Sequence, residues 1–323
     1  MTTARHHQYR FLDGPDWKDP LRPAVAFWRH EPLADQDAAA LAAAVVRWAE
    51  DSETEIVKVT PASSWQLVDR GVGDAWDGDP IGRRTFVSGV VSAAEDWARL
   101  RPLATDRGMV AIQIEAVARV REAMGPNACI LATVFTPLFQ AMKLALPAGV
   151  GPWIAEAPQA LAVAMERLTE DTRVVVASLM AAGADGIFIA DHHAGDPSIP
   201  TWWQQEVALP AESRCLGELG DRFLVRHYHG GAPSRERIPA GNAVLHFDRT
   251  PEWAIDDDSI ALIHGLEPTM INDAADEALD LAWRGLLAGR PRNAVALGAS
   301  CCVLPDTPPD RLRRLRRIAR EMR

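Results

Sequence analysis

The sequence predicts an α/β protein, a single (β/α)8 TIM barrel that spans residues 1–323. Eight short apolar runs along the chain are typical of parallel strands that are buried on both faces. Segments with helical periodicity separate most of these runs, and polar side chains follow the ends of the runs. Alternating strands and helices, with the chemistry gathered at one end of the strands, favour this barrel.

The expected strands are rich in Val, Ile, Leu or Phe. In chain order they cover residues 24–28, 56–60, 130–135, 185–190, 223–229, 243–248, 261–266 and 294–299. The segments between them carry apolar residues three and four positions apart, which predicts amphipathic helices. These helices are expected at residues 34–50, 109–124, 157–182, 273–287 and 308–320.

The uneven spacing of the strands predicts additions to the plain barrel. An N-terminal extension precedes the first strand. The segment 61–128 contains three tryptophans and many glycines, and we expect it to fold over one end of the barrel as a lid-like insertion. Residues 194–210 form a second addition, which is a candidate for a dimer contact.

The composition limits the classes of partner. A net charge of −10 argues against binding to a phosphate backbone, so no nucleic-acid partner is expected. The arginine-rich run 311–323 is expected to be a solvated helix face. The four cysteines do not form a secreted disulfide framework, and no signal peptide or membrane span is evident. We therefore expect a cytoplasmic protein that acts on a small molecule and has no membrane partner.

Polar residues end or follow most of the expected strands. Seven of the nine histidines lie in or just beyond these runs. In a (β/α)8 barrel the carboxyl ends of all eight strands meet at one mouth, where the active site lies. The candidate site residues at this mouth are Arg29, His30, Lys58, Asp191, His192, His227, His229, Cys301 and Cys302.

The strongest candidate for a metal site is the pair His227 and His229 together with Cys301 or Cys302. Residues i and i+2 of an extended chain project to the same side, so the two imidazoles are expected on the same face of the strand. One thiolate from the last strand would complete three ligands and leave a fourth position open, as in catalytic zinc sites. The alternative is that the histidines are only hydrogen-bonded and that the cysteines are small core residues.

His246 and Asp248 lie on the next expected strand, two residues apart, and so share one face. They are candidates for a fourth ligand, or for partners that orient His227. The alternative is a polar strand end that hydrogen-bonds to the backbone.

Several motifs in order along the chain resemble the uroporphyrinogen decarboxylase superfamily. They are Arg-Pro at 22–23 with Phe-Trp-Arg at 27–29, Glu-Ile-Val-Lys-Val at 55–59, Phe-Thr-Pro at 135–137, Gly-Ala-Asp-Gly-Ile at 183–187, and Gly298 with Leu-Pro-Asp-Thr-Pro at 304–308. The resemblance extends from about residue 20 to the end of the chain. The superfamily also contains zinc-dependent methyltransferases that act on methylated corrinoid proteins and coenzyme M.

The methyltransferase branch matches better than the decarboxylase branch. The decarboxylases carry an Arg-Gln-Ala-Gly-Arg motif where this chain has Trp-Arg-His-Glu-Pro at 28–32, and their C-terminal histidine falls at Cys301. The methyltransferases carry a zinc motif of His-x-Cys and a later Cys, which His227, His229 and Cys301 match except for the histidine at 229. The resemblance thus implies a zinc site, with a set of two nitrogens and one sulfur that leaves the metal more Lewis acidic.

Arg29 and His30 are candidates to clamp a substrate carboxylate or phosphate, because a guanidinium binds such groups in a bidentate manner. The alternative for Arg29 is an ion pair with Glu31 or Asp35.

Three further residues are candidates for catalysis. Lys58 lies among apolar neighbours, and we interpret it as a base or an anion anchor, or else as the partner of Glu55 or Asp248. Asp191 and His192 follow the fourth strand and are candidates for a proton donor or a group that orients the substrate. We expect Asp191 to be the one that faces inward. The alternative for both is a loop cluster that hydrogen-bonds to the backbone.

These observations lead to one main hypothesis and two alternatives. The first is a zinc-dependent methyltransferase-like enzyme that activates a thiol for methyl transfer from a corrinoid or another activated donor. The second is a metal-independent decarboxylase or lyase that acts on a polycarboxylate. The third is a non-catalytic binder of a corrinoid or tetrapyrrole. The resemblance also implies a corrinoid protein as a candidate partner and a homodimer as a candidate assembly.

Overall fold

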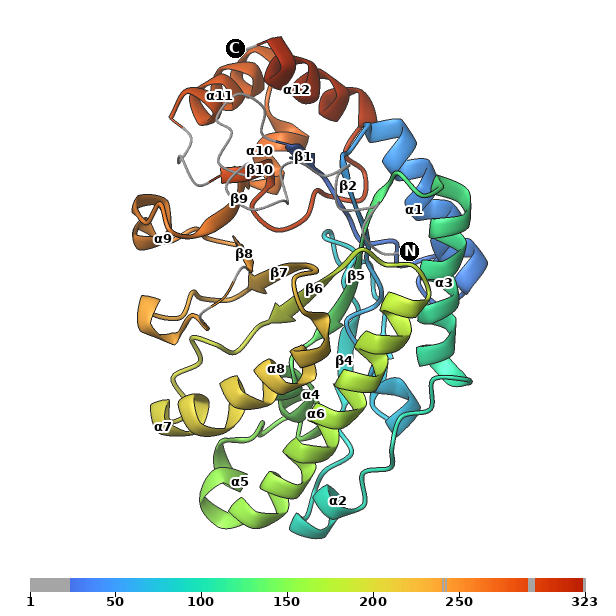
Figure 1. Ribbon diagram of the computed structural model, residues 1–323, viewed down its shortest axis with the longest axis vertical. Helices are drawn as coiled ribbons and strands as arrows, with labels where there is room; N and C mark the ends of the chain where they lie inside the picture. Colours follow the sequence, from blue (N-terminus) through green and yellow to red (C-terminus); the bar gives the residue numbers. More distant parts are fainter. Residues whose placement is uncertain (1–23, 240, 242, 290–293, 322–323) are drawn as a thin grey trace.

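The computed structural model describes residues 24–239, 241, 243–289 and 294–321. The expected N-terminal extension and the Arg-Pro motif at 22–23 lie outside the described residues. Eight parallel strands form one sheet in the order β1-β10-β9-β8-β7-β6-β5-β2, surrounded by helices (Figure 1). The strands are β1 (Ala24–Ala26), β2 (Ile56–Val59), β5 (Cys129–Phe135), β6 (Gly186–Asp191), β7 (Phe223–Tyr228), β8 (Val244–Phe247), β9 (Ala261–Leu266) and β10 (Ala294–Ala299). The predicted (β/α)8 barrel is confirmed, with every expected strand in its place.

The barrel is nearly closed, and its seam lies between β1 and β2. Glu55 N donates a hydrogen bond to Val25 O at 2.9 Å, and the Glu55 carboxylate accepts one from Val25 N at 2.9 Å. The Thr54 hydroxyl accepts a further bond from Phe27 N at 2.9 Å. The side chains of Glu55 and Thr54 therefore accept hydrogen bonds from backbone N–H groups that carbonyls of a neighbouring strand would otherwise accept.

The barrel helices occupy the expected segments. They are α1 (Ala38–Ser52), α3 (Gly108–Met124), α6 (Pro158–Ala181), α11 (Asp276–Ala288) and α12 (Pro309–Glu321). The helix expected at 273–287 is α11 and begins at Asp276, because a separate short helix, α10 (Pro268–Asp273), precedes it. The Arg311 guanidinium binds Ile271 O at 2.8 Å and also Ala274 O, so it takes up carbonyls that a continuous helix would use internally.

Helix α12 has a buried apolar side in addition to the expected solvated face. Its apolar side, including Leu312 and Leu315, is buried in a core cluster beside β1 and β10. Its arginines form ion pairs with neighbouring elements, among them Arg314 with α11 and Arg320 with Glu55 at the seam. This helix therefore covers the end of the sheet where the barrel closes (Figure 1).

The segment 61–128 contains the expected additions and one barrel helix. An antiparallel hairpin, β3 (Gly73–Ala75) and β4 (Thr85–Ser88), is followed by the short helix α2 (Ala94–Ala98). Helix α3 completes the segment and packs against α1 as part of the outer ring. No helix in the described part of the chain is long and apolar enough to cross a membrane.

Candidate metal centre

His227 and His229 lie at the carboxyl end of β7 and point into the barrel. His227 is the fifth residue of the strand and is buried, whereas His229 follows the strand and is half-buried. The register places His227 opposite Ala190 of β6 and His246 of β8. A backbone bond of 2.9 Å from His229 N to Asp191 O continues this pairing beyond the strand and fixes the second imidazole beside the first.

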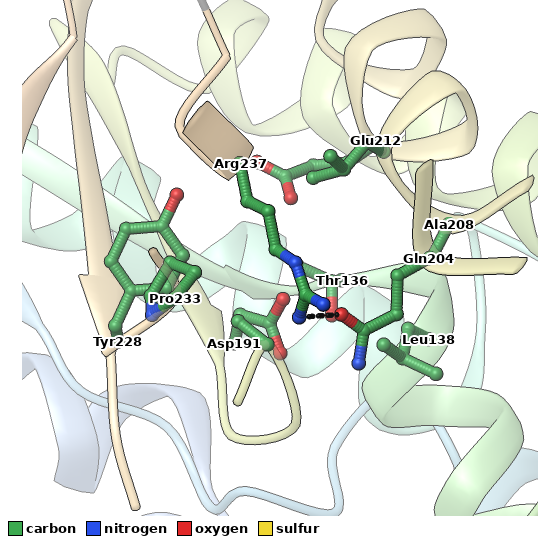
Figure 2. A pocket seen from close by; sticks show the side chains of 11 residues that line it. Thr136, Leu138, Asp191, Gln204, Ala208, Glu212, Tyr228, Pro233 and Arg237 are labelled. Carbon is green, nitrogen blue, oxygen red and sulfur yellow. Dashed lines mark hydrogen bonds between the residues drawn. The ribbon is translucent and has the colours of Figure 1, made fainter. Parts of the chain in front are cut away.

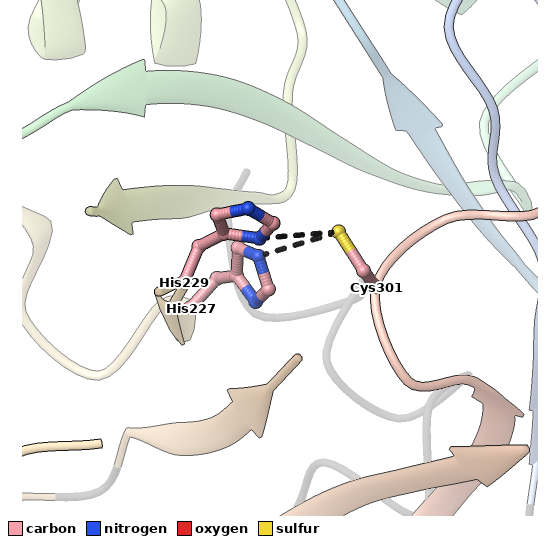
Figure 3. Close-up of side chains that lie close together, drawn as sticks. All are labelled: His227, His229 and Cys301. Carbon is pink, nitrogen blue, oxygen red and sulfur yellow. Dashed lines mark hydrogen bonds between the residues drawn. The ribbon is translucent and has the colours of Figure 1, made fainter. Parts of the chain in front are cut away.

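Cys301 reaches the two imidazoles from the segment after β10, more than 70 residues away in sequence. Its Sγ lies 3.7 Å from His227 Nε2 and 3.7 Å from His229 Nδ1, as Figure 3 shows. The three donor atoms all lie within 4.8 Å of one another. The carboxyl ends of β7 and β10 thus converge as the barrel geometry requires.

The spacing of these atoms fits a tetrahedral zinc ion. Zinc binds sulfur at about 2.3 Å and imidazole nitrogen at about 2.0–2.1 Å, which puts a tetrahedral N···S edge at about 3.6 Å. Both N···S distances here are 3.7 Å. Three protein ligands would leave one position open, as in catalytic sites. The same distances also allow hydrogen bonds between the sulfur and the imidazoles.

Of the two adjacent cysteines, Cys301 is the one that faces the imidazoles. A hydrogen bond from Cys302, followed by those from His227 and His229, holds the pKa of the Cys301 thiol well below its usual range. The same bond to Cys301, together with burial, raises the pKa of Cys302 well above its usual range. Cys302 is buried in the main core cluster. Of the two cysteines, Cys301 is therefore the one whose thiolate form is favoured.

Lys58 lies inside the barrel near the cysteines. Its Nζ donates to Thr60 Oγ1 at 3.1 Å and lies 4.5 Å from the centre of the Phe188 ring. Within the described part of the chain, no carboxylate forms an ion pair with it, so neither expected partner, Glu55 nor Asp248, is found there. Burial lowers the pKa of Lys58 to about 8, and the negative charge of Cys302 and Cys301 opposes this shift.

His30 also lies in the mouth. Burial and the positive charge of Lys58 lower the pKa of His30 to about 4, and the nearby Cys301 sulfur raises it in part. His30 is therefore a neutral imidazole near the metal centre. Arg29, the next residue along the chain, is bound elsewhere. Its guanidinium pairs with Glu31 at 2.7 Å, donates to Pro305 O at 2.8 Å and stacks 4.1 Å from the Trp48 ring.

The structure reverses the expected orientation of Asp191 and His192. The His192 ring lies 4.8 Å from the His229 ring and packs edge-on against Phe139 at 4.9 Å. Burial, and then the neighbouring His229 and His227, lower the pKa of His192 well below its usual value. His192 is therefore the neutral group that faces the metal centre.

Asp191 points to the outer side of the barrel wall. It lines a small pocket with Tyr228, Glu212 and Arg237, as Figure 2 shows. Its carboxylate accepts a hydrogen bond from His193 N at 2.7 Å, and burial raises its pKa to about 6. The expectation that Asp191 faces inward is wrong, because β6 turns alternate side chains to opposite faces and Phe188 and His192 take the inner one.

Sequence reasoning missed Arg83, which follows the turn at 79–82 in the long insertion. Its positive charge acts on His30, His229 and Cys302 from above the mouth. The only pairing described for its side chain is with Asp79 in its own turn, at 3.2 Å. The signal for this position is Gly82, whose positive φ and close packing on His30 mark a tight turn at the site.

Two imidazoles and a cysteine sulfur lie together at the C-terminal mouth of this (β/α)8 barrel, which is an arrangement suited to metal binding. The chain belongs to the uroporphyrinogen decarboxylase (URO-D) family, whose model matches residues 82–322. This confirms the resemblance given by the sequence motifs. A search of curated proteins finds no significant match.

Solved structures share the fold over nearly the whole chain. A methyltransferase from Methanosarcina mazei matches with a TM-score of 0.76 and 16% identity, over 93% of this chain and 94% of its own. A B12-independent methionine synthase from Shewanella sp. W3-18-1 matches with a TM-score of 0.58 and 12% identity, over 93% and 96%. At these identities the likeness establishes the common fold.

Proposed function

We propose that this protein is a zinc-dependent methyltransferase-like enzyme that activates a thiol acceptor. The observation that carries the proposal is the placement of Cys301 Sγ at 3.7 Å from one nitrogen each of His227 and His229. A ligand set that leaves one tetrahedral position open suits a substrate thiol rather than a purely structural ion. Membership of a superfamily that includes zinc-dependent methyltransferases supports the same conclusion.

His227, His229 and Cys301 would hold the zinc ion. Zinc bound there lowers the pKa of a substrate thiol, so that the thiolate persists at neutral pH. The His192 imidazole beside His229 would stay neutral because its pKa is lowered, so it would orient the substrate by a hydrogen bond while the thiol proton leaves to solvent. Lys58 places a positive charge near the sulfur atoms and stabilises negative charge in the mouth.

The thiolate would attack the methyl group of an activated donor, forming the S–CH3 bond while the bond between the methyl group and the donor breaks and its electron pair stays with the donor. The family resemblance favours a corrinoid, carried by a partner protein, and the likeness to a B12-independent enzyme keeps other activated donors within the proposal. Because His229 stands where the methyltransferases have cysteine, the acceptor thiolate is expected to be a weaker nucleophile than with two sulfur ligands. A homodimer in the cytoplasm is part of the same proposal.

The placement of two residues disfavours a decarboxylase. That alternative needs Arg29 to grip a carboxylate and Asp191 to protonate the product next to Lys58. Arg29 is instead bound to Glu31 and Pro305, and Asp191 lines a pocket on the outer side of the wall. The remaining inward groups suit metal binding and thiol activation better.

The proposal is tested by zinc content after a chelator wash and reloading under reducing conditions. Wild type is expected to hold about one zinc per chain, and His229→Ala and Cys301→Ser to bind it at least about 100-fold more weakly, since even outer partners contribute about 10–100-fold. The matched controls are His264→Ala, whose ring bonds to Thr250 outside the cluster, and Cys215→Ser, whose thiol donates to Glu212 O on α8 (Leu209–Cys215). Both controls should retain zinc.

Activity is then measured as methylation of a thiol by methylcobalamin, with and without zinc. Zinc-dependent product in wild type and its loss in His229→Ala would support the proposal. A wild-type protein that binds no zinc, or variants at positions 229 and 301 that bind it as well as the controls, would overturn it.

A further inference from the structure

His246 lies next to His227 inside the barrel and has no role in the chemistry described above. It is on β8, directly opposite His227 in the register, and is fully buried. The two ring centres are 4.7 Å apart with an angle of 31° between the planes. Trp28 packs edge-on against the His246 ring at 5.1 Å.

The hydrogen bonds of His246 determine which nitrogen carries its proton. Its Nε2 lies 3.1 Å from Ala299 O, and a carbonyl oxygen can only accept. The proton of the neutral ring is therefore on Nε2, and Nδ1 presents a lone pair. Among the described residues, this buried Nδ1 has no hydrogen-bond partner.

His227 presents the complementary group. Its Nε2 faces Cys301, and a nitrogen that binds a metal must offer its lone pair. The proton of the neutral ring is then on Nδ1, which is also buried and also without a partner in the described part of the chain. An unpaired donor and an unpaired acceptor thus occur on two adjacent, facing rings. Buried polar atoms rarely stay unpaired, so we expect hydrogen bonding to link the two Nδ1 atoms.

We propose that His246 is a positioning residue, whose Nδ1 accepts the Nδ1 proton of His227 through one buried water, since the two atoms do not bond directly. This bond holds His227 with Nε2 toward the metal, a task that a carboxylate or a carbonyl usually performs for metal-bound histidines. Of the nearby Asp248 carboxylate, Oδ2 accepts from Gly230 N at 2.8 Å and lies 3.7 Å from His229 Nδ1, whereas the buried Oδ1 bonds neither to His227 nor to any other described residue. The inference rests on the proposed metal site.

Two substitutions separate this role from simple packing. In His246→Asn, the amide oxygen takes roughly the place of Nδ1 and can accept from His227. In His246→Gln, the amide nitrogen takes roughly the place of Nε2 and can donate to Ala299 O, but the acceptor for His227 is lost. Zinc affinity is measured by chelator competition, and the absorption spectrum of the cobalt-loaded protein reports the ligand geometry.

The expected result is a fall in zinc affinity of about 10–100-fold for His246→Gln, and of less than about threefold for His246→Asn. The cobalt spectrum should change only in the Gln variant. In zinc-loaded wild type, nitrogen NMR should find the proton of His227 on Nδ1 and that of His246 on Nε2.

Equal losses in both variants, or no loss in either, would overturn the positioning role while leaving the metal site intact. If neither variant folds, the NMR tautomers of wild type decide, because a proton on His246 Nδ1 is incompatible with the proposal. A wild-type protein that binds no metal overturns the proposed function, and this inference with it.

Discussion

At the scale of single residues, strand alternation decides which polar groups meet in the mouth. On β7, His227 faces the barrel interior while its neighbour Arg226 pairs with Glu212 on the helical side. On β6 the same alternation turns His192 inward and Asp191 outward. Successive side chains of a strand point to opposite faces of the sheet. Two residues that are neighbours in the sequence therefore have different surroundings and different roles.

Lys58 gives a prediction at this scale, because its buried charge has no carboxylate partner. Folding lowers its pKa from 10.5 to about 8, so the unfolded chain binds more protons between these values. The free energy of unfolding should therefore rise with pH from about 8 to 10.5. Below pH 8 the full cost of burying the charged Lys58, on the order of 3 kcal/mol, is present. Lys58→Met should stabilise the metal-free protein at pH 7 by about 1–2 kcal/mol, because lost contacts to Thr60 and Phe188 offset part of the gain.

The measurement is urea unfolding of wild type and variant at pH 7 and pH 9. The stabilisation should shrink at the higher pH, since wild-type Lys58 is then largely neutral. Lys143→Met is the control, as this lysine is only half-buried and lies over the Phe86 and Phe139 rings at the surface. A Lys58→Met protein that is less stable than wild type at pH 7 would contradict the expected cost.

At the scale of elements, close approaches between strands determine how the sheet closes beside the site. β1 and β10 pair in parallel with Ala26 opposite Gly298. A Cβ at position 298 would lie 2.0 Å from Ala26 O, and this backbone atom cannot move aside without breaking the ladder. Gly298 thus allows β10 to lie where it delivers Cys301 to the histidines.

Gly298→Ala is therefore expected to lower the free energy of unfolding by more than about 2 kcal/mol, the cost of overpacking against a rigid neighbour. Gly285→Ala on α11 is the matched control, because a Cβ there meets nothing within 4 Å and the helix backbone accepts it. The control should gain about 0.5–1 kcal/mol. Equilibrium urea unfolding checks both, and a similar change in the two variants would refute the close approach as the cause.

For the molecule as a whole, the turn at Gly82 in the insertion after β2 packs against residues of the barrel mouth. Gly82 packs so closely that a Cβ would lie 2.9 Å from His30 Cβ and 3.1 Å from Pro305 Cγ. Arg84, two residues on, pairs with the buried Asp35 at 3.0 Å and fastens the hairpin to the barrel. We propose that this segment acts as a lid, which limits the access of solvent to Cys301.

Gly82→Leu is expected to lift the turn from His30 and to expose the thiol beneath it. The rate at which a thiol reagent modifies Cys301 in the metal-free protein should rise roughly tenfold, the effect of about 1.4 kcal/mol on local opening. Gly78→Leu is the control, since that glycine also has a positive φ but nothing within 4 Å of its Cβ position. Equal acceleration in both variants would show that backbone strain, and not the lost cover, is responsible.

The eight strands, most of the helices and the chain order of the candidate ligands could be predicted from the sequence. Continuous apolar runs and helical periodicity depend on local composition, so they appear before any tertiary contact is known. The pair His227 and His229 could be predicted as a unit, because two residues along a strand always share a face. The start of the 273–287 helix at Asp276 could not be predicted in this way, since Arg311 from another helix binds a carbonyl of the segment before it.

Only the tertiary structure decided which candidates meet. In the folded chain, Cys301 rather than Cys302 lies beside the imidazoles, and His192 rather than Asp191 faces the site. Arg29 pairs with Glu31, and the charge of Arg83 acts on His229. Each of these outcomes depends on the register between strands, on the path of a loop or on a contact between residues far apart in the chain. The physical reason is that a side chain's direction at a strand end is set by the pairing of its neighbours, which no local pattern records.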